Sequence, residues 1–225
     1  MTGHGDDGHG HSGGMSHHER VRAVYDDAAP AYDALLPDLR VEQPVDRAMI
    51  GAFCDEVLAT SDHRVLDAGC GNGRMIQELR SRGVSPQGVD LSSGMIGQAR
   101  RREPEIDFRV ADLRHLPYAD ASFGGVIAWY SLIHYDYPEL AEALTELARV
   151  TAPGGILLTG FQSGAGAREI VNAYGTSGTM TAWLHPPQEL GSIAERSGWT
   201  TTATTLRAPV MEPYGQGFVL ARRAG

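Results

Sequence analysis

Residues 65–74 read VLDAGCGNGR, and this stretch decides the fold. Val65 and Leu66 begin an apolar strand that ends at Asp67, and glycines follow at alternate positions, Gly69, Gly71 and Gly73. Glycine adopts positive φ angles without strain and has no side chain, so a ligand can lie close to its backbone. A strand that passes through a glycine turn into a helix also presents free backbone N–H groups. The stretch therefore predicts a nucleotide site.

The glycine spacing narrows the choice of nucleotide. The pattern is G-x-G-x-G, whereas the dinucleotide fingerprint is G-x-G-x-x-G, and position 74 is Arg instead of Gly. This spacing disfavours a nicotinamide-dependent dehydrogenase. Cys70 lies inside the turn, where a small side chain is the simplest requirement, and no partner base is evident for a reactive thiol. With Cys54 as the second cysteine, no disulfide framework is expected.

Composition and charge exclude several classes of protein. The chain has 225 residues and a formal charge of −9, with 42% hydrophobic and 21% charged residues. An acidic chain without a basic block argues against a nucleic-acid partner. No apolar run approaches the ~20 residues of a membrane-spanning helix, and the N-terminus lacks the apolar stretch of a signal peptide. We therefore expect a cytoplasmic protein with no membrane partner.

The chain divides into a short tail and one large domain. Residues 1–16, MTGHGDDGHGHSGGMS, are rich in glycine and histidine and cannot bury enough surface to offset the entropy of ordering, so a disordered tail is predicted. Its histidines would bind a metal only weakly, and no metal site is expected. Residues 17–225 are predicted to form a single domain, with an N-terminal helical cap at 17–60. Residues 162–185, rich in Ser, Gly, Thr and Ala, are interpreted as a lid or substrate-binding insertion.

Strands and helices alternate after the cap. Within the cap, apolar positions at helical spacing predict a helix over 18–29, which Pro30 interrupts, and another over 44–58. The strands expected next are 64–68, 87–91, 106–110, 124–129 and 156–161, and the helices are 73–82, 92–102, 138–150 and 187–197. Such alternation predicts a parallel sheet covered on both faces. The segments 199–206 and 217–221 predict a terminal antiparallel pair.

Polar residues follow several of these strands. The loops after parallel strands lie at one edge of the sheet, where ligands bind, so Gly69–Gly73, Asp90, Asp112 and Tyr130–His134 should converge on one cleft. Asp90 lies about 20 residues after the glycines, and a carboxylate there can accept both ribose hydroxyls. Asp112 can accept a hydrogen bond from the amino group of an adenine.

Four stretches together resemble a known family. VLDAGCGNGR, GVDLS, VADLRHLPYADASFGGVIAWYSLIHY and ELARVTAPGGILLTGF are similar to the successive motifs of class I S-adenosylmethionine-dependent methyltransferases. The most similar branch is the small-molecule, ubiquinone/menaquinone-biosynthesis-like branch, and the resemblance covers about residues 18–222. It implies a doubly wound, mostly parallel seven-stranded Rossmann-like sheet with an antiparallel C-terminal strand and an N-terminal helical cap. It also implies S-adenosylmethionine as cofactor and S-adenosylhomocysteine as product.

The resemblance assigns cofactor contacts residue by residue. The turn would pass beneath the methionyl and ribose parts, Asp67 would orient the amino end, Asp90 would take the ribose hydroxyls and Asp112 would hold the adenine amino group. The full set of implied cofactor-binding residues is Tyr25, Tyr32, Asp67, Gly69, Cys70, Gly71, Asp90, Leu91, Met95, Ala111, Asp112, Leu113 and Trp129. Tyr32 and Met95 are equally compatible with plain packing roles.

Methyl transfer itself requires that a nucleophile be held in line with the S–CH3 bond, and a base is needed only where the acceptor loses a proton. The candidates are His134, on the loop at the cleft edge, then His185, where the insertion joins the next helix, and Tyr130. Each of them is also compatible with a structural role, and Tyr174, Tyr214 and Glu212 are further pocket candidates.

The acceptor is predicted to be a small-molecule metabolite, natural-product or quinone-like. The Asn/Asp-Pro-Pro-aromatic element of methylases that act on nitrogen in DNA or protein is absent after the fourth strand, which reads WYSLIHY, and the Pro-Cys nucleophile of cytosine-ring methylases is absent too. Transfer to O, N or C stays open, as does a monomer or homodimer. Two alternatives remain: an enzyme of this fold that binds the cofactor but catalyses cyclisation, decarboxylation or rearrangement, and a non-enzymatic cofactor-binding module.

Overall fold

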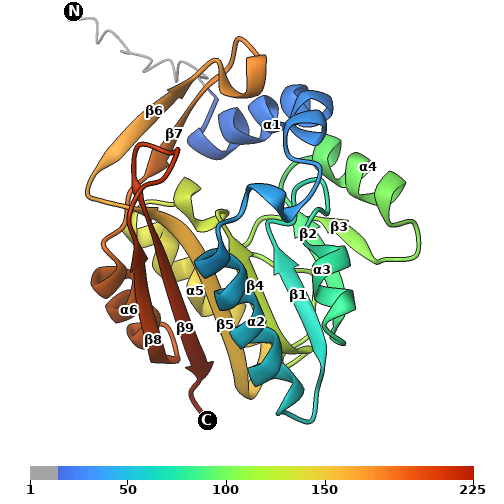
Figure 1. The fold of residues 1–225 in the computed structure, drawn as a ribbon, viewed down its shortest axis with the longest axis vertical. Helices are drawn as coiled ribbons and strands as arrows, with labels where there is room; N and C mark the ends of the chain where they lie inside the picture. The colour runs from blue at the N-terminus through green and yellow to red at the C-terminus, as the bar shows by residue number, and fades with distance from the viewer. Residues whose placement is uncertain (1–14) are drawn as a thin grey trace, which may run out of the picture.

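The computed structural model describes residues 15–225, and seven strands form one sheet in the order β3-β2-β1-β4-β5-β9-β8 (Figure 1). Strands β3, β2, β1, β4 and β5 pair in parallel, and β9 pairs antiparallel with both β5 and β8. The strands are β1 (Arg64–Ala68), β2 (Ser85–Asp90), β3 (Phe108–Val110), β4 (Phe123–Trp129), β5 (Thr151–Ser163), β8 (Trp199–Arg207) and β9 (Gly215–Arg223). The predicted doubly wound sheet with an antiparallel C-terminal strand is confirmed.

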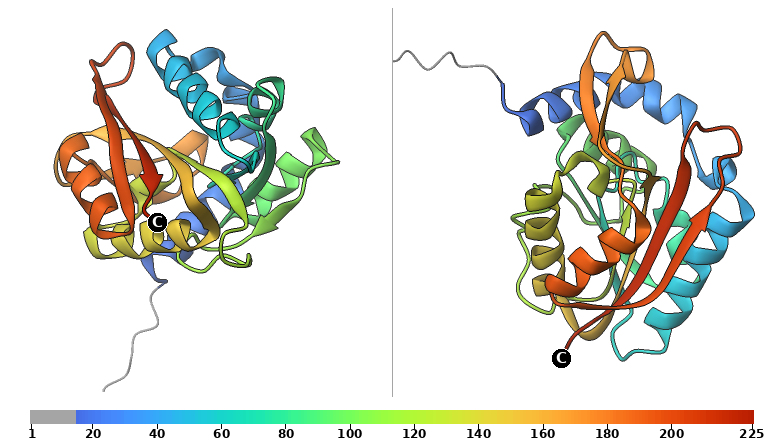
Figure 2. Two further views of the ribbon diagram at one scale, coloured as in Figure 1. Left: turned by 90° about the horizontal axis from the view of Figure 1, so that it is seen from below. Right: turned by 90° about the vertical axis from the view of Figure 1, so that its left-hand side faces the viewer.

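Helices cover both faces of the sheet (Figures 1 and 2). Successive strand residues point to opposite faces, so Val65 and Ile127 pack with α2 and α3, whereas Leu66 and Val126 pack with α5 and α6. The helices are α1 (His17–Leu35), α2 (Pro44–Leu58), α3 (Ile76–Ser81), α4 (Ser93–Arg102), α5 (Tyr137–Val150) and α6 (Pro187–Arg196). Three 3-10 helices are η1 (Leu39–Val41), η2 (Leu132–His134) and η3 (Ala173–Gly175).

Helix α3 is shorter than predicted, because it begins at Ile76 instead of Gly73. Gly73 has φ +75°, in the left-handed region, so it belongs to the turn and cannot start the helix. A Cβ at Gly73 would lie 3.2 Å from the Cβ of Ala99 in α4. The glycine thus also lets the turn pack closely on the neighbouring helix.

Helix α1 does not stop at Pro30, which corrects the sequence-based expectation. The helix runs to Leu35 with Pro30 inside it, and it crosses the carboxyl-end edge of the sheet (Figures 1 and 2). Proline has no N–H, so the carbonyl of Asp26 loses its helical donor. The Asp26 carboxylate fastens this part of α1 to α4, because it accepts the hydroxyl of Ser92 at 2.7 Å and the N–H of Gly94 at 2.8 Å. Tertiary contacts thus offset the cost of the proline.

The segment 162–185 contains a second, two-stranded sheet that the weak sequence pattern did not predict. Strand β6 (Ala167–Val171) pairs antiparallel with β7 (Thr179–Trp183), and η3 lies between them. The hairpin stands beside α1 at the carboxyl-end edge (Figure 2). Met180 and Ala173 of the hairpin pack against Val21 and Val24 of α1. The hairpin and α1 therefore form one cover over this edge.

The predicted disordered tail falls almost entirely outside the described residues. Ser16, its last residue, is ordered and caps α1 reciprocally with Glu19, at 3.2 and 2.7 Å. Within residues 15–225, no helix is both long and apolar enough to cross a lipid bilayer.

Candidate functional site

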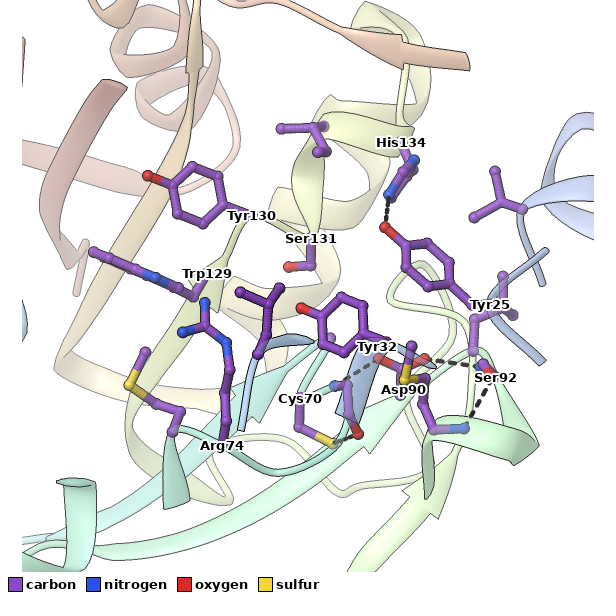
Figure 3. Close-up of a pocket in the computed structure, with 18 of the residues that line it drawn as sticks. Tyr25, Tyr32, Cys70, Arg74, Asp90, Ser92, Trp129, Tyr130, Ser131 and His134 are labelled. Atoms are coloured by element: carbon purple, nitrogen blue, oxygen red, sulfur yellow. Dashed lines mark hydrogen bonds between the residues drawn. The ribbon is translucent and has the colours of Figure 1, made fainter. Parts of the chain in front are cut away.

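A cavity of about 440 Å³ lies at the carboxyl ends of β1, β2 and β4, under α1 and the β6–β7 hairpin (Figure 3). Most of the residues singled out from the sequence line it. They are Tyr25, Tyr32, Asp67, Gly69, Cys70, Gly71, Asp90, Leu91, Met95, Leu113, Trp129, Tyr130 and His134. Segments more than 100 residues apart in the chain thus meet around one space.

Residues of the glycine turn, Gly69, Cys70 and Gly71, line the cavity. The N–H groups of Gly69 and Cys70 both donate to the carbonyl of Val89, at 2.8 and 2.9 Å. Gly69 has φ +83°, and a Cβ there would lie 2.2 Å from the Cβ of Ser131. Ser131 follows β4, so only a glycine lets the ends of β1 and β4 approach this closely. Burial raises the pKa of the Cys70 thiol well above its usual range, which fits a packing role.

Asp90 presents an ordered carboxylate to the cavity. One oxygen accepts the N–H of Gly71 at 2.8 Å and the other accepts the N–H of Ser92 at 2.8 Å. Burial raises the pKa of Asp90 to about 6, although these backbone donors lower it. Each oxygen retains a further lone pair. The carboxylate is therefore fixed in place and still able to accept hydroxyl groups.

Asp67, at the end of β1, is almost fully buried, with 1% of its surface exposed. Its Oδ2 atom has no hydrogen-bond partner within the described chain. Burial raises the pKa of Asp67 to about 7, Arg74 lowers it and Asp90 raises it further. A buried acceptor without a partner is costly, so this carboxylate is suited to a positively charged donor inside the cavity.

Beside Asp67, Arg74 lines the cavity and is held rigidly (Figure 3). Its guanidinium donates to Glu42 at 2.7 Å and to the carbonyl of Asp38 at 3.3 Å. Glu42 also accepts the indole N–H of Trp129 at 3.2 Å. The side chains of Arg74 and Glu42 are 11% and 6% exposed, so this is a buried ion pair. Its charges and the carboxylate of Asp67 give the methionyl end of the predicted site both signs of charge.

Three tyrosines form an aromatic wall under the cover. The ring centroids of Tyr25 and Tyr32 are 6.3 Å apart, and Tyr174 of the hairpin lies 5.9 Å from Tyr25 and 4.8 Å from Tyr32. Tyr174 has φ +52°, which is strained for a residue with a side chain. Burial raises the pKa of all three phenols, so they are un-ionised at neutral pH. Tyr25 and Tyr32 were predicted to contact the cofactor, whereas Tyr174 was predicted only to line the pocket.

His134 of η2 contacts α1 and β7 through its ring, and its contact with Tyr25 of α1 is visible in Figure 3. Its Nε2 atom lies 3.0 Å from the hydroxyl of Tyr25 in α1, and its Nδ1 atom lies 3.3 Å from the carbonyl of Thr181 in β7. Burial lowers the pKa of His134 to about 4, so the ring is neutral at pH 7. A carbonyl only accepts, so Nδ1 carries the proton and Nε2 accepts from Tyr25. The hydrogen bonds thus fix both the tautomer and the tyrosine hydroxyl.

Tyr130 and Trp129 close the cavity on the β4 side, with ring centroids 5.5 Å apart (Figure 3). Tyr130 has φ +58°, an unusual backbone conformation for an aromatic residue. Its N–H donates to the carbonyl of Gly160 at 2.8 Å, which holds this turn against β5. Such strain at the end of a central strand is typical of residues that a site requires in place.

Three residues singled out from the sequence do not line the cavity: Ala111, Asp112 and His185. The carboxylate of Asp112 is bound by the guanidinium of Arg114, with contacts from 2.6 to 3.2 Å. Burial raises the pKa of Asp112, but the bonds from Arg114 outweigh it and the net shift is downward. His185 is fully buried next to Phe161 and Tyr137, and burial lowers its pKa to about 4.

Several charged residues of the cavity were missed by sequence reasoning. Arg207 of β8 bridges Asp46 at 2.7 Å and Glu212 at 2.6 Å, and Arg168 of β6 lines the same end. Of these, only Glu212 was noticed in the sequence. Charged residues on helices and edge strands usually face solvent, so their sequence pattern carried no signal. Arg74 could have been found, because it directly follows the glycine turn.

Comparison with known proteins agrees with this geometry. Residues 65–155 match the family model described as a methyltransferase domain. A demethylmenaquinone methyltransferase from Renibacterium salmoninarum is 36% identical over 140 residues, which are 62% of this chain and 57% of that protein. The chain thus matches little more than half of the length of this relative.

Solved structures show the same fold at low sequence identity. The 1,6-didemethyltoxoflavin-N1-methyltransferase of Burkholderia thailandensis, solved with S-adenosylhomocysteine bound, has a TM-score of 0.68 and 19% identity. The alignment covers 94% of this chain and 92% of that protein. The [4+2]-cyclase SpnF has a TM-score of 0.70 and 17% identity, covering 93% and 96% of the two chains. Residues 65–155 thus match the methyltransferase domain family, and the described chain has the Rossmann-like methyltransferase fold.

Proposed function

We propose that this protein binds S-adenosylmethionine and transfers its methyl group to a small-molecule acceptor. The observation that carries the proposal is the unpartnered, buried carboxylate oxygen of Asp67, which shares one cavity with the glycine turn and the fixed carboxylate of Asp90. A cofactor that presents an ammonium group and two ribose hydroxyls would satisfy both carboxylates. The match to the methyltransferase domain over residues 65–155 supports the same reading.

The residues would divide the cofactor between them. Asp67 would accept the ammonium group, and Arg74, anchored on Glu42, would face the carboxylate of the methionyl end. Asp90 would take the ribose hydroxyls, and Met95 and Leu113 would flank the adenine. Asp112 would reach the adenine amino group only if its bonds to Arg114 rearranged.

The contacts of His134 favour a protein that positions the acceptor over one that abstracts a proton from it. When bound, S-adenosylmethionine supplies an electrophilic methyl group, so the protein mainly has to orient the acceptor and exclude water. His134 is a weak base at neutral pH, and its Nε2 atom already accepts from Tyr25. We therefore assign His134 to orienting the Tyr25 hydroxyl, whose remaining lone pairs can accept a hydrogen bond from the acceptor. Tyr130 would form part of the acceptor wall, and His185 has no contact with the cavity.

A cofactor-dependent reaction without methyl transfer is the second candidate, because the fold also occurs in a protein named as a [4+2]-cyclase. The non-enzymatic binding module remains the third. Incubation with S-adenosylmethionine carrying a labelled methyl group, with a panel of small metabolites, separates the three. Label in the acceptor and release of S-adenosylhomocysteine support transfer. Turnover without that release would assign the protein to the second candidate, and tight cofactor binding without any turnover to the third.

The remaining expectations belong with this proposal. We infer that residues 17–225 act as one domain and that the hairpin within 162–185 serves as part of the acceptor wall. A cytoplasmic location and a monomeric or homodimeric state stay predictions from the sequence.

A further inference from the structure

Among the arginines that line the cavity and are at least half-buried, one has no carboxylate partner, and this arginine points to the acceptor. Arg74 pairs with Glu42 at 2.7 Å, and Arg207 pairs with Asp46 and Glu212. Arg168 has no carboxylate within 4.0 Å anywhere in residues 15–225. Arg22 also lacks one within that range, but it is exposed on α1, whereas Arg168 is half-buried.

The guanidinium of Arg168 is nevertheless held firmly. Its Nε and Nη2 atoms donate to the amide oxygen of Gln162, at 3.0 and 2.6 Å. Its central carbon lies 5.4 Å from the centroid of the Tyr214 ring. Gln162 lies at the end of β5 and Tyr214 lies in the loop just before β9. These two segments therefore orient an arginine of the hairpin. The Nη1 atom has no hydrogen bond to any described residue.

The guanidinium of Arg168 has a neutral hydrogen-bond partner but no counter-ion. A half-buried cation without a counter-ion loses hydration and gains little in return, since a neutral amide oxygen is a weaker partner than an anion. The planar fork of a guanidinium matches a carboxylate with two parallel hydrogen bonds. The ordering of the side chain has already occurred, so a carboxylate could bind at low entropic cost.

We propose that Arg168 binds a carboxylate of the acceptor, and that the acceptor is therefore a carboxylate-bearing small molecule. The inference rests on the proposed function, because it assumes that the hairpin end of the cavity holds the acceptor. It goes beyond it in naming a chemical class and the residue that selects it. Gln162 then has a defined part: its amide holds the guanidinium in the absence of the acceptor, and its N–H groups can donate to the same carboxylate.

The test compares matched pairs of ligands that differ only in charge. Calorimetry measures the binding of 4-hydroxybenzoate and its neutral amide, 4-hydroxybenzamide, with aliphatic acid and amide pairs alongside. Each titration is run at pH 8, both without and with saturating S-adenosylhomocysteine. We expect the wild-type protein to bind at least one carboxylate tenfold or more tightly than its amide. We expect Arg168→Gln to remove this preference while the affinity for the amide stays unchanged, and Arg168→Lys to retain part of it.

Controls separate a binding role from a structural one. Arg80→Gln removes a surface arginine that pairs with Glu103 and should leave the preference intact. Gln162→Leu removes the amide that holds the guanidinium but leaves the charge, so the preference should fall by less than in Arg168→Gln. A wild-type protein that binds no carboxylate more tightly than its amide overturns the proposal. So does an Arg168→Gln variant that keeps the preference, or one whose only defect is weaker binding of S-adenosylhomocysteine.

The two proposals fail in different ways. If the wild-type protein does not bind S-adenosylhomocysteine at all, the proposed function fails, while the acid-to-amide comparison without it still reports on Arg168. If S-adenosylhomocysteine binds normally and the acid-to-amide preference is absent, the acceptor class fails alone.

Discussion

Asp90 provides the most direct test of the proposed cofactor site. The variant is Asp90→Ala, with Asp107→Ala as a matched control, because Asp107 is a carboxylate at the surface that pairs with Arg109 at 2.8 Å. The expectation is that only the first variant weakens binding of S-adenosylhomocysteine. The measurement is calorimetric titration at pH 8, where Asp90 is ionised because its pKa is about 6.

The size of the effect follows from the hydrogen bonds of the carboxylate. A hydrogen bond to a charged group contributes about 1.5–3 kcal/mol, and each 1.4 kcal/mol is tenfold in affinity. Loss of one ribose contact therefore raises the Kd about tenfold, and loss of both raises it about a hundredfold or more. The variant should also unfold more easily in urea, since the N–H groups of Gly71 and Ser92 each lose an acceptor at 2.8 Å.

Asp90→Asn sharpens the comparison. An asparagine has one accepting oxygen, so its NH2 group would have to face the N–H of either Gly71 or Ser92. We expect this variant to lose affinity as well, although it preserves shape. If Asp90→Ala remains folded and binds S-adenosylhomocysteine within twofold of the wild type, the ribose site lies elsewhere and the assignment of the cavity is wrong.

Three further predictions concern the neighbours of this site. Binding of S-adenosylhomocysteine between pH 6 and 7 should release protons, because an ammonium partner favours ionised Asp67, whose pKa is about 7 in the empty cavity. Calorimetry in buffers of different ionisation enthalpy should detect this proton release, and Asp67→Asn should remove most of it. His134→Ala and Tyr25→Phe should each lower kcat about tenfold or more with little change in cofactor Kd. The double variant should lower kcat no more than either single variant, and additive losses of kcat would mean that the two residues act separately. Glu42→Ala should lower the free energy of unfolding by about 3–5 kcal/mol, because buried Arg74 loses its partner. By contrast, Glu103→Ala, whose partner Arg80 has an exposed side chain, should cost under about 1 kcal/mol in urea denaturation.

The proposed cofactor half of the cavity was predictable because its residues stand at the carboxyl ends of neighbouring parallel strands. Gly69 and Tyr130 each follow a strand and Asp90 ends one, and parallel pairing with right-handed crossovers brings all such positions to one edge. Sheet topology alone therefore places them. Side-chain direction is a different matter, as Asp112 shows: it is at the expected edge, but Arg114 lies two residues further on and binds its carboxylate.

The proposed acceptor half of the cavity was not predictable, because its charged residues come from distant segments and form pairs that no local pattern reveals. Asp46 and Arg207 form a bidentate ion pair although 161 residues separate them. No local periodicity reports such a pair, because each residue separately has the pattern of a solvated surface charge. The same holds for Arg168, which belongs to a hairpin whose alternation is masked by its many small and polar residues. The prediction that Pro30 interrupts the helix was wrong for a related reason. Contacts between α1 and α4 offset the local cost of a proline inside a helix.

His134 shows how the two halves are joined. Its ring binds Tyr25 of α1 on one side and Thr181 of β7 on the other, and its own carbonyl accepts from His17 at 3.0 Å. Displacement of either α1 or the hairpin would leave a buried ring nitrogen without a partner, at a cost of about 1–3 kcal/mol. The sequence placed a histidine at the cavity edge and suggested a base. The structure gives the physical reason for a different role: a neutral ring with one donor and one acceptor binds the cover on both sides at once, and burial disfavours the charged ring.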